Sequence, residues 1–203
     1  MAIVVVGGNT RNIGKTSVVA ALIARFPEFR WIAFKITQFG HGFCTSDGRP
    51  CACQTNEACV AVNLERDPAS GTDTSRFLAA GAERVFWVRT RIGRLADAMP
   101  RVCAEIAAAT NAILESNSVL EFLQPDLYLT VLDPAARDFK DSARRFLPRA
   151  DAILCTGPDD TPATLDPALH AKPRFAVAPP DWLPDALAEF VHARLAAVAS
   201  DTR

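Results

Sequence analysis

Residues 1–25 restrict the fold more than any other part of the sequence. Residues 2–6 are a continuous run of apolar, mostly β-branched side chains, which predicts a strand buried on both faces of a sheet. A turn rich in glycine and asparagine follows at 7–14, and residues 15–25 then have the apolar spacing of an amphipathic helix. When a strand, a turn and a helix follow one another in this way, the first N–H groups of the helix and the positive end of its dipole point to the space over the turn. The segment therefore predicts an α/β fold with an anion-binding turn.

The rest of the chain continues to alternate between strands and helices. Strands are predicted at 31–35, 84–88, 112–115, 127–132, 152–156 and 174–177, and helices at 74–80, 95–109, 138–147 and 184–199. We expect Pro100 to interrupt the helix at 95–109 and Asp73 to cap the helix at 74–80. Strands joined by crossover helices form a mostly parallel sheet covered on both faces. The sequence therefore predicts one domain over residues 1–203, a three-layer α/β/α fold with a sheet of about seven strands.

The charge balance and the apolar runs exclude several classes of protein. The 22 basic and 23 acidic residues nearly cancel, which argues against a protein that binds nucleic acid through bulk positive charge. No apolar run reaches the roughly 18 residues that a membrane span needs, and the N-terminus lacks the basic start of a secretory signal. We therefore expect a cytoplasmic protein that binds neither membranes nor nucleic acid.

Gly14-Lys15-Thr16 lies at the junction of turn and helix, where a phosphate-binding loop carries its functional side chains. Lys15 supplies a charge for phosphates, and the Thr16 hydroxyl suits a magnesium ion. The consensus G-x-x-x-x-G-K-[S/T] would place its first glycine at Asn9, whereas glycines stand at 7 and 8. Either Asn9 adopts a left-handed backbone, or the loop is one residue longer, or the match is a chance glycine-rich turn. The residues of this loop predicted to contact a nucleotide are Gly8, Asn9, Thr10, Arg11, Asn12, Ile13, Gly14, Lys15, Thr16 and Ser17.

Further stretches of the chain resemble a known family. Residues 34–43 carry a lysine at a strand end and then His41, residues 71–76 read Gly-Thr-Asp-Thr-Ser-Arg before Ala-Gly-Ala at 80–82, and an apolar strand ends in Glu115-Ser116. Over residues 4–19, 32–43, 71–85 and 112–116, the chain resembles the molybdopterin-guanine dinucleotide biosynthesis protein B (MobB) family, a branch of the dimeric P-loop GTPases and ATPases. The resemblance implies a P-loop NTPase fold, a homodimer, and Mg²⁺ with ATP or GTP as ligands.

Two features depart from the family pattern. The guanine-reading motif Asn-Lys-x-Asp is missing, since residues 155–160 read Cys-Thr-Gly-Pro-Asp-Asp, and the choice between ATP and GTP therefore stays open. A cysteine-rich insert at about residues 36–73 is not a usual feature of the family. We interpret the chain as a divergent relative with a separate role.

Three charged residues at predicted strand or helix ends complete the site in this interpretation. Glu115 ends a strand where the family carries its acidic residue, and we expect it to hold Mg²⁺ together with Thr16 or to polarise the attacking water. Asp73 is a second candidate as ligand or base, although it also suits a helix cap. Lys35 ends the second strand and is expected to contact phosphate or an acidic substrate, unless it is an edge lysine that reaches into solvent. The predicted catalytic residues are Lys15, Glu115 and Asp73.

Four of the six cysteines fall within sixteen residues, at Cys44, Cys51, Cys53 and Cys59. Four thiolates in a loop without periodicity suit one zinc ion or an iron–sulfur cluster, and metal binding would explain how such a stretch becomes ordered. A redox disulfide, a reactive thiol and unligated cysteines are the alternatives. Cys103 and Cys155 are interpreted as small buried apolar side chains.

These features predict Mg²⁺-dependent binding and hydrolysis of ATP or GTP, in the service of the maturation of a metal- or cofactor-containing enzyme. One alternative is a nucleotide-switched accessory protein that delivers a metal or cluster to a client enzyme with little turnover. Another is a small-molecule kinase on the same scaffold. Residues 132–147, which include Lys140, are interpreted as a solvated helix face or as a mobile switch.

Overall fold

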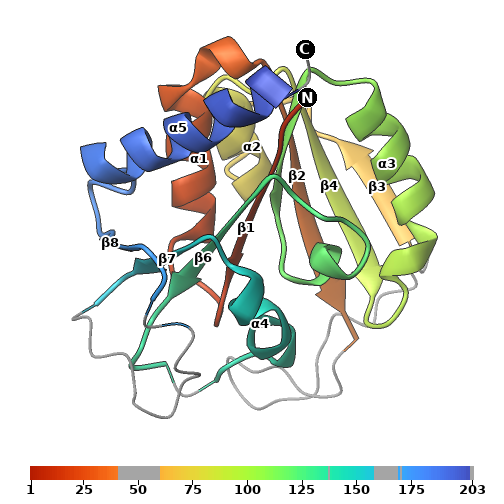
Figure 1. The fold of residues 1–203 in the computed structure, drawn as a ribbon. Helices are drawn as coiled ribbons and strands as arrows, with labels where there is room; N and C mark the ends of the chain where they lie inside the picture. Colours follow the sequence, from red (N-terminus) through yellow and green to blue (C-terminus); the bar gives the residue numbers. More distant parts are fainter. Residues whose placement is uncertain (41–59, 137, 158–168, 170, 202–203) are drawn as a thin grey trace.

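The N-terminal strand β1 (Ile3–Gly8) lies inside a sheet, between β5 (Asn111–Glu115) and β6 (Leu127–Leu132). The structure is a computed structural model that describes all residues except 41–59, 137, 158–168, 170 and 202–203 (Figure 1). The other strands are β2 (Trp31–Phe39), β3 (Val60–Leu64), β4 (Arg84–Arg91), β7 (Ala152–Cys155) and β8 (Arg174–Ala176). In the described residues the sheet has eight strands in the order β3-β4-β2-β5-β1-β6-β7-β8, and every neighbouring pair except β3–β4 is parallel.

The seven predicted strands are all present, and β3 is an additional strand that was not predicted. This strand pairs antiparallel at the edge of the sheet, and none of its side chains is fully buried. An edge strand needs no continuous apolar run, so it left no clear period in the sequence. β2 and β4 are also longer than predicted and stay paired as far as Phe39 and Arg91.

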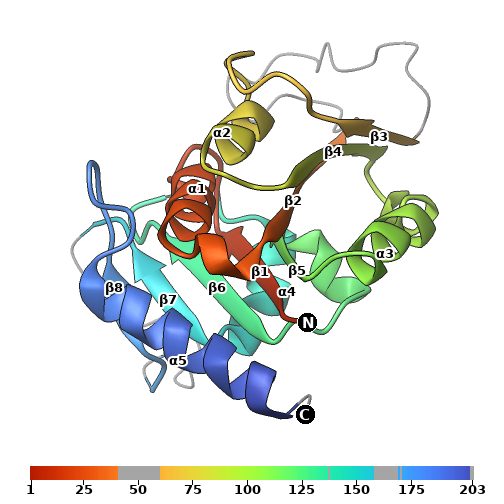
Figure 2. The ribbon, with the colours of Figure 1, turned by 90° about the horizontal axis from the view of Figure 1, so that it is seen from above.

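The helices are α1 (Lys15–Arg25), α2 (Asp73–Ala79), α3 (Met99–Ala107), α4 (Asp141–Phe146) and α5 (Asp185–Asp201). Figure 2 shows α1, α2 and α5 on one face of the sheet and α3 on the other, with α4 on the same side as α3. Alternate residues of β1 follow this division, because Val4 and Val6 pack in the cluster with α1 and α5, whereas Val5 packs with α3. The three-layer α/β/α fold is therefore confirmed.

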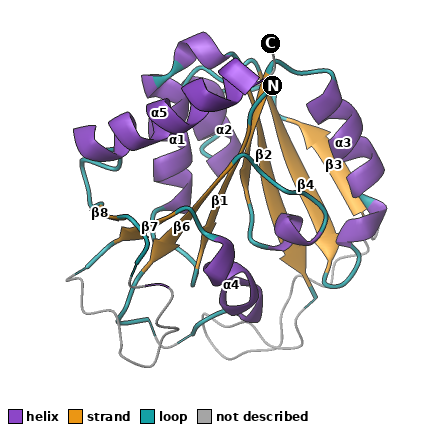
Figure 3. Ribbon diagram, in the orientation of Figure 1, coloured by secondary structure: helices purple, strands orange, loops and turns teal. Residues whose placement is uncertain are grey.

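Two helix predictions, for the helices drawn as α3 and α4 in Figure 3, were wrong in detail. Pro100 does not interrupt a long helix, because it stands in the first turn of α3, where a missing N–H costs no hydrogen bond. A separate short 3₁₀ helix, Leu95–Asp97, precedes it. α4 begins at Asp141 rather than 138, because residues 138–140 lie against the loop after β1.

Cys103 and Cys155 have different surroundings. Cys155 is buried in β7, as predicted. Cys103 is exposed, which corrects the prediction that it is a core residue. Its neighbour Val102 faces the core instead, and one residue along a helix turns the side chain by about 100°.

The cap of α2 is Thr72 and not Asp73, since the Thr72 Oγ1 accepts a hydrogen bond from the Ser75 backbone N–H at 3.1 Å. We expect Thr72→Ala to lower the free energy of unfolding by about 1 kcal/mol, the usual effect of losing such a cap. Urea denaturation measures it, and Thr72→Ser, which keeps the hydroxyl, should stay close to the unsubstituted protein. Equal losses in both variants would contradict the assignment of the cap.

Within the described residues, no helix is both long and apolar enough to cross a bilayer.

Candidate functional site

The loop between β1 and α1 has two residues in the left-handed backbone region, Asn12 (φ 56°) and Gly14 (φ 97°). Asn9 is not one of them, which excludes the alternative in which Asn9 replaces a left-handed glycine. Its side chain instead fixes the loop to the end of β6. The Asn9 Nδ2 donates to the Asp133 carbonyl at 2.8 Å, and the Asp133 N–H donates to the Asn9 Oδ1 at 3.0 Å. Asn9 is therefore a positioning residue beneath the loop.

A close contact with Asn117, a residue not predicted from the sequence, requires a glycine at position 7. The Asn117 side chain accepts a hydrogen bond from the Gly8 N–H and donates one to the Gly8 carbonyl, both at 2.8 Å. A Cβ at residue 7 would lie 2.1 Å from the Asn117 Oδ1. The only sequence signal for Asn117 is its place two residues after the end of β5.

Lys15 closes the loop on itself, since its ammonium donates to the Thr10 carbonyl at 2.6 Å. Burial and then the nearby charge of Lys140 are the largest causes that lower the pKa of Lys15 to about 8. Both effects disfavour the charged form of Lys15 in the free protein. An anion bound over the loop would instead favour that charged form.

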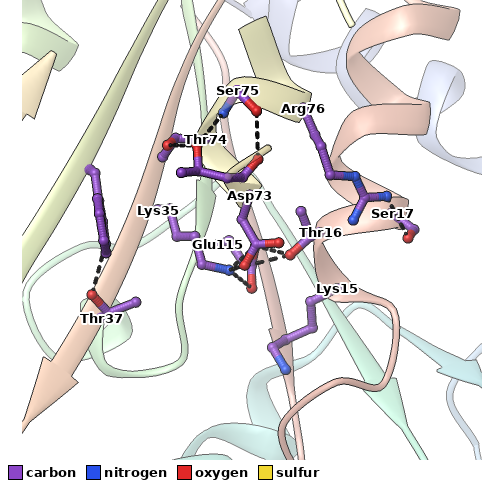
Figure 4. Close-up of polar contacts among 12 residues, drawn as sticks. Lys15, Thr16, Ser17, Lys35, Thr37, Asp73, Thr74, Ser75, Arg76 and Glu115 are labelled. Atoms are coloured by element: carbon purple, nitrogen blue, oxygen red, sulfur yellow. Dashed lines mark hydrogen bonds and ion pairs between the residues drawn. The ribbon is translucent and has the colours of Figure 1, made fainter. Parts of the chain in front are cut away.

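Thr16, Lys35, Asp73 and Glu115, which lie far apart in the sequence, meet at one point. Lys35 and Glu115 are register partners in β2 and β5, and the Lys35 Nζ lies 3.0 Å from the Glu115 Oε1. The same ammonium lies 2.6 Å from the Asp73 Oδ2 and 3.3 Å from the Thr16 Oγ1. The Thr16 hydroxyl also donates to the Glu115 Oε2 at 2.8 Å. Figure 4 shows Asp73, Glu115 and Thr16 converging on the Lys35 ammonium.

The two carboxylates of this cluster differ in their exposure to solvent. The Glu115 side chain is 7% exposed and that of Lys35 is 14% exposed, whereas that of Asp73 is 45% exposed. Lys35 is therefore not an edge lysine reaching into solvent, and Glu115 is not a surface carboxylate. Asp73 stands in the first turn of α2, at the open side of the cluster.

A cavity of about 1120 Å³ lies over the loop and the cluster. The predicted residues that line it are Arg11, Asn12, Ile13, Gly14, Lys15, Thr16, Ser17, Lys35, Asp73 and Glu115. Gly8, Asn9 and Thr10 are not among its lining residues. The cavity continues past Lys35 along the carboxyl-terminal part of β2, at Thr37, Gln38 and Phe39, and reaches Trp87 in the middle of β4.

The predicted metal ligands Cys44, Cys51, Cys53 and Cys59 lie outside the described residues. His41, which belongs to the family resemblance and not to the predicted metal site, also lies outside them. Within the part of the chain that the structure describes, no three His, Cys, Asp or Glu side chains are grouped so as to hold a metal ion. The cysteine site therefore stays a prediction.

Comparisons with known proteins bear on the fold. Neither the protein-family models nor the curated proteins gave a match, so membership of the MobB family also stays a prediction. Among solved structures, HypB from Helicobacter pylori in complex with nickel aligns with a TM-score of 0.56 and 15% identity over 98% of this chain and 87% of HypB.

LpxK from Aquifex aeolicus in complex with ATP aligns with a TM-score of 0.49 and 16% identity. The alignment covers 87% of this chain but 53% of LpxK, so the chain spans about half the length of that protein. The sheet order, the loop after β1 and the similarity to HypB together show a P-loop NTPase fold.

Proposed function

We propose that this protein binds a nucleoside triphosphate with Mg²⁺ and hydrolyses it. The observation that carries the proposal is the placement of Lys15 and Thr16 in the first turn of α1, directly after a glycine-containing loop, where they line a cavity that Glu115 also lines. Backbone N–H groups at this helix end suit phosphate oxygens, and the Lys15 ammonium adds a charge. The proposal extends to Ser17 and the loop residues before it, whose backbone would surround the phosphates.

The donor set beside the loop fits magnesium. The Thr16 hydroxyl and the Glu115 carboxylate are hard oxygen ligands, which Mg²⁺ prefers, and they already contact each other. Asp73 supplies a further carboxylate on the exposed side. When bound, Mg²⁺ would neutralise charge on the phosphate oxygens.

In hydrolysis, a water oxygen forms a bond to the γ-phosphorus while the bond from that phosphorus to the β–γ bridging oxygen breaks. The products are a nucleoside diphosphate and inorganic phosphate. Glu115 or Asp73 would orient the water and accept its proton. Lys15 and Lys35 would offset the negative charge on the phosphates.

Nucleotide-dependent thermal unfolding tests the binding step. We expect ATP or GTP with Mg²⁺ to raise the unfolding temperature, since a ligand at a hundred times its dissociation constant stabilises by about 2.7 kcal/mol. Comparison of ATP, GTP, ADP and GDP also decides the base preference. No stabilisation by any of the four at millimolar concentration would refute the proposal.

The position of Lys35 gives a second test, because its ammonium now contacts all three oxygen donors proposed for magnesium. We expect MgCl₂ without nucleotide to leave the unsubstituted protein unchanged, but to stabilise Lys35→Met, by about 1.4 kcal/mol at ten times the dissociation constant. Differential scanning calorimetry at constant ionic strength measures this, and Lys35→Arg, which keeps a cation, serves as the control. Equal stabilisation of all three proteins would contradict the assigned ligands.

A second candidate function is the delivery of a metal or cluster to a client enzyme, with nucleotide-dependent homodimerisation. The four cysteines between β2 and β3 favour it, and HypB, which has a similar fold, was solved in complex with nickel. Elemental analysis and sedimentation, each with and without nucleotide, test it. Metal content that is unchanged when Cys44, Cys51, Cys53 and Cys59 are replaced by serine would refute this candidate.

A small-molecule kinase is favoured by the extension of the cavity past Lys35. Trp87 and Thr37 form part of its wall, and the Trp87 Nε1 donates to the Thr37 Oγ1 at 2.9 Å. This part of the cavity offers an acceptor both an aromatic surface and polar groups. Fast ATP turnover with no acceptor present would argue against a kinase and for a hydrolase.

A further inference from the structure

Lys140 lies in the segment between β6 and α4 that the sequence analysis interpreted as a solvated helix face or a switch. Its backbone N–H donates to the Asn9 carbonyl at 2.9 Å. Two residues earlier, the Asp138 carboxylate accepts a hydrogen bond from the Thr10 hydroxyl at 2.6 Å. These contacts hold Lys140 against the same part of the loop that the Lys15 ammonium contacts through the Thr10 carbonyl.

The Lys140 side chain is half-buried and lines the same cavity as Lys15. Within the described residues its ammonium makes no hydrogen bond and no ion pair. Burial and then the charge of Arg11 lower the pKa of Lys140, and Lys35 acts in the same direction. The nearby carboxylates Asp138 and Glu115 offset this only in part.

Several cations therefore face one cavity, and two of them, Lys15 and Lys140, repel each other. A half-buried ammonium without a partner is unfavourable in the free protein, since like charges and burial both destabilise it. An anionic ligand in the cavity would remove both costs. A solvated helix face would need none of these contacts.

We propose that Lys140 is a second phosphate-binding lysine, which contacts the di- or triphosphate of the nucleotide together with Lys15. This inference rests on the proposed function and adds a residue from outside the loop to the phosphate site. It also gives the β6–α4 segment a role, because the hydrogen bond from the Lys140 N–H to the Asn9 carbonyl and the one from the Thr10 hydroxyl to Asp138 position Lys140 for that contact.

Titration calorimetry with ATP, inorganic triphosphate and adenosine tests this inference on Lys140→Met. We expect ATP and triphosphate to bind at least tenfold more weakly than to the unsubstituted protein, because a charge-assisted contact is lost. Adenosine, which has no phosphate, should bind equally to both proteins. The melting temperature of the free variant should not fall, because the lost ammonium has no partner there.

Arg145→Met is the matched control, because it removes one positive charge from α4 at an exposed position whose partner is Glu121 at 3.4 Å. We expect its affinity for ATP to stay within twofold of the unsubstituted protein. Lys140→Gln, which keeps a polar tip, should behave like Lys140→Met and replaces it if the methionine variant does not fold. Unchanged ATP and triphosphate affinity in the folded Lys140 variant, or an equal loss in Arg145→Met, would overturn the inference.

The proposed function and this inference fail in different ways. If the unsubstituted protein binds neither ATP nor GTP, the proposed function is wrong. If that protein binds ATP, Lys15→Ala loses affinity and Lys140→Met does not, the phosphate site stands and only the role of Lys140 is wrong.

Discussion

Replacing Lys15 by alanine is expected to weaken the binding of ATP or GTP by roughly 10- to 150-fold. The substitution removes a charge-assisted contact to the phosphates, which contributes about 1.5–3 kcal/mol. It leaves the backbone N–H groups of the loop and the start of α1 in place, so residual binding should persist. Titration calorimetry at one fixed salt concentration measures the change, because ionic strength alters electrostatic binding.

Lys172→Ala provides a control for the loss of a lysine that also donates to a backbone carbonyl. The Lys172 ammonium contacts the Ala150 carbonyl at 2.6 Å, but Lys172 does not line the cavity. Its nucleotide affinity should therefore match that of the unsubstituted protein. If Lys15→Ala binds nucleotide as well as Lys172→Ala does, the loop is not the phosphate site.

The strands and the main site residues were predictable because their signals are local. Each buried strand is a short apolar run, and the direction of a run tells at which edge of the sheet it ends, although β2 continues to Phe39 beyond its predicted end at Lys35. Lys35 and Glu115 were assigned to the same edge of the sheet for this reason, and the register between β2 and β5 pairs them. Lys15 and Thr16 follow from their place at the start of a helix.

The residues that the sequence analysis missed depend on long-range contacts. Asn117 supports Gly8 from 109 positions away, and Asn9 joins Asp133 across 124 positions. A single asparagine is not part of a periodic apolar pattern. The residues next to it in the sequence also do not indicate which distant residue its side chain contacts. The segment with Lys140 was interpreted only as a solvated helix face or a mobile switch, because nothing local shows that the Lys140 N–H donates to the Asn9 carbonyl.

Replacing Glu115 by alanine is expected to lower the free energy of unfolding of the nucleotide-free protein by about 3 kcal/mol. Removing one partner of a buried ion pair typically costs about 3–5 kcal/mol, because the other charge is left buried without compensation. Lys35 would keep Asp73 as a partner, which places the expected loss at the lower end of that range. Urea denaturation without nucleotide measures the loss.

The double variant Lys35→Met/Glu115→Met distinguishes the contribution of the ion pair to stability from that of side-chain packing. Replacing both charges with apolar side chains leaves no uncompensated ammonium, so its stability should lie closer to that of the unsubstituted protein than Glu115→Ala does. Glu83→Ala is the matched surface control, because the Arg30–Glu83 pair is 64% and 42% exposed and such pairs contribute about 0–1 kcal/mol. If Glu115→Ala is no more destabilising than Glu83→Ala, the Lys35 ammonium does not depend on Glu115, and the oxygen cluster proposed for magnesium is not assembled in the free protein.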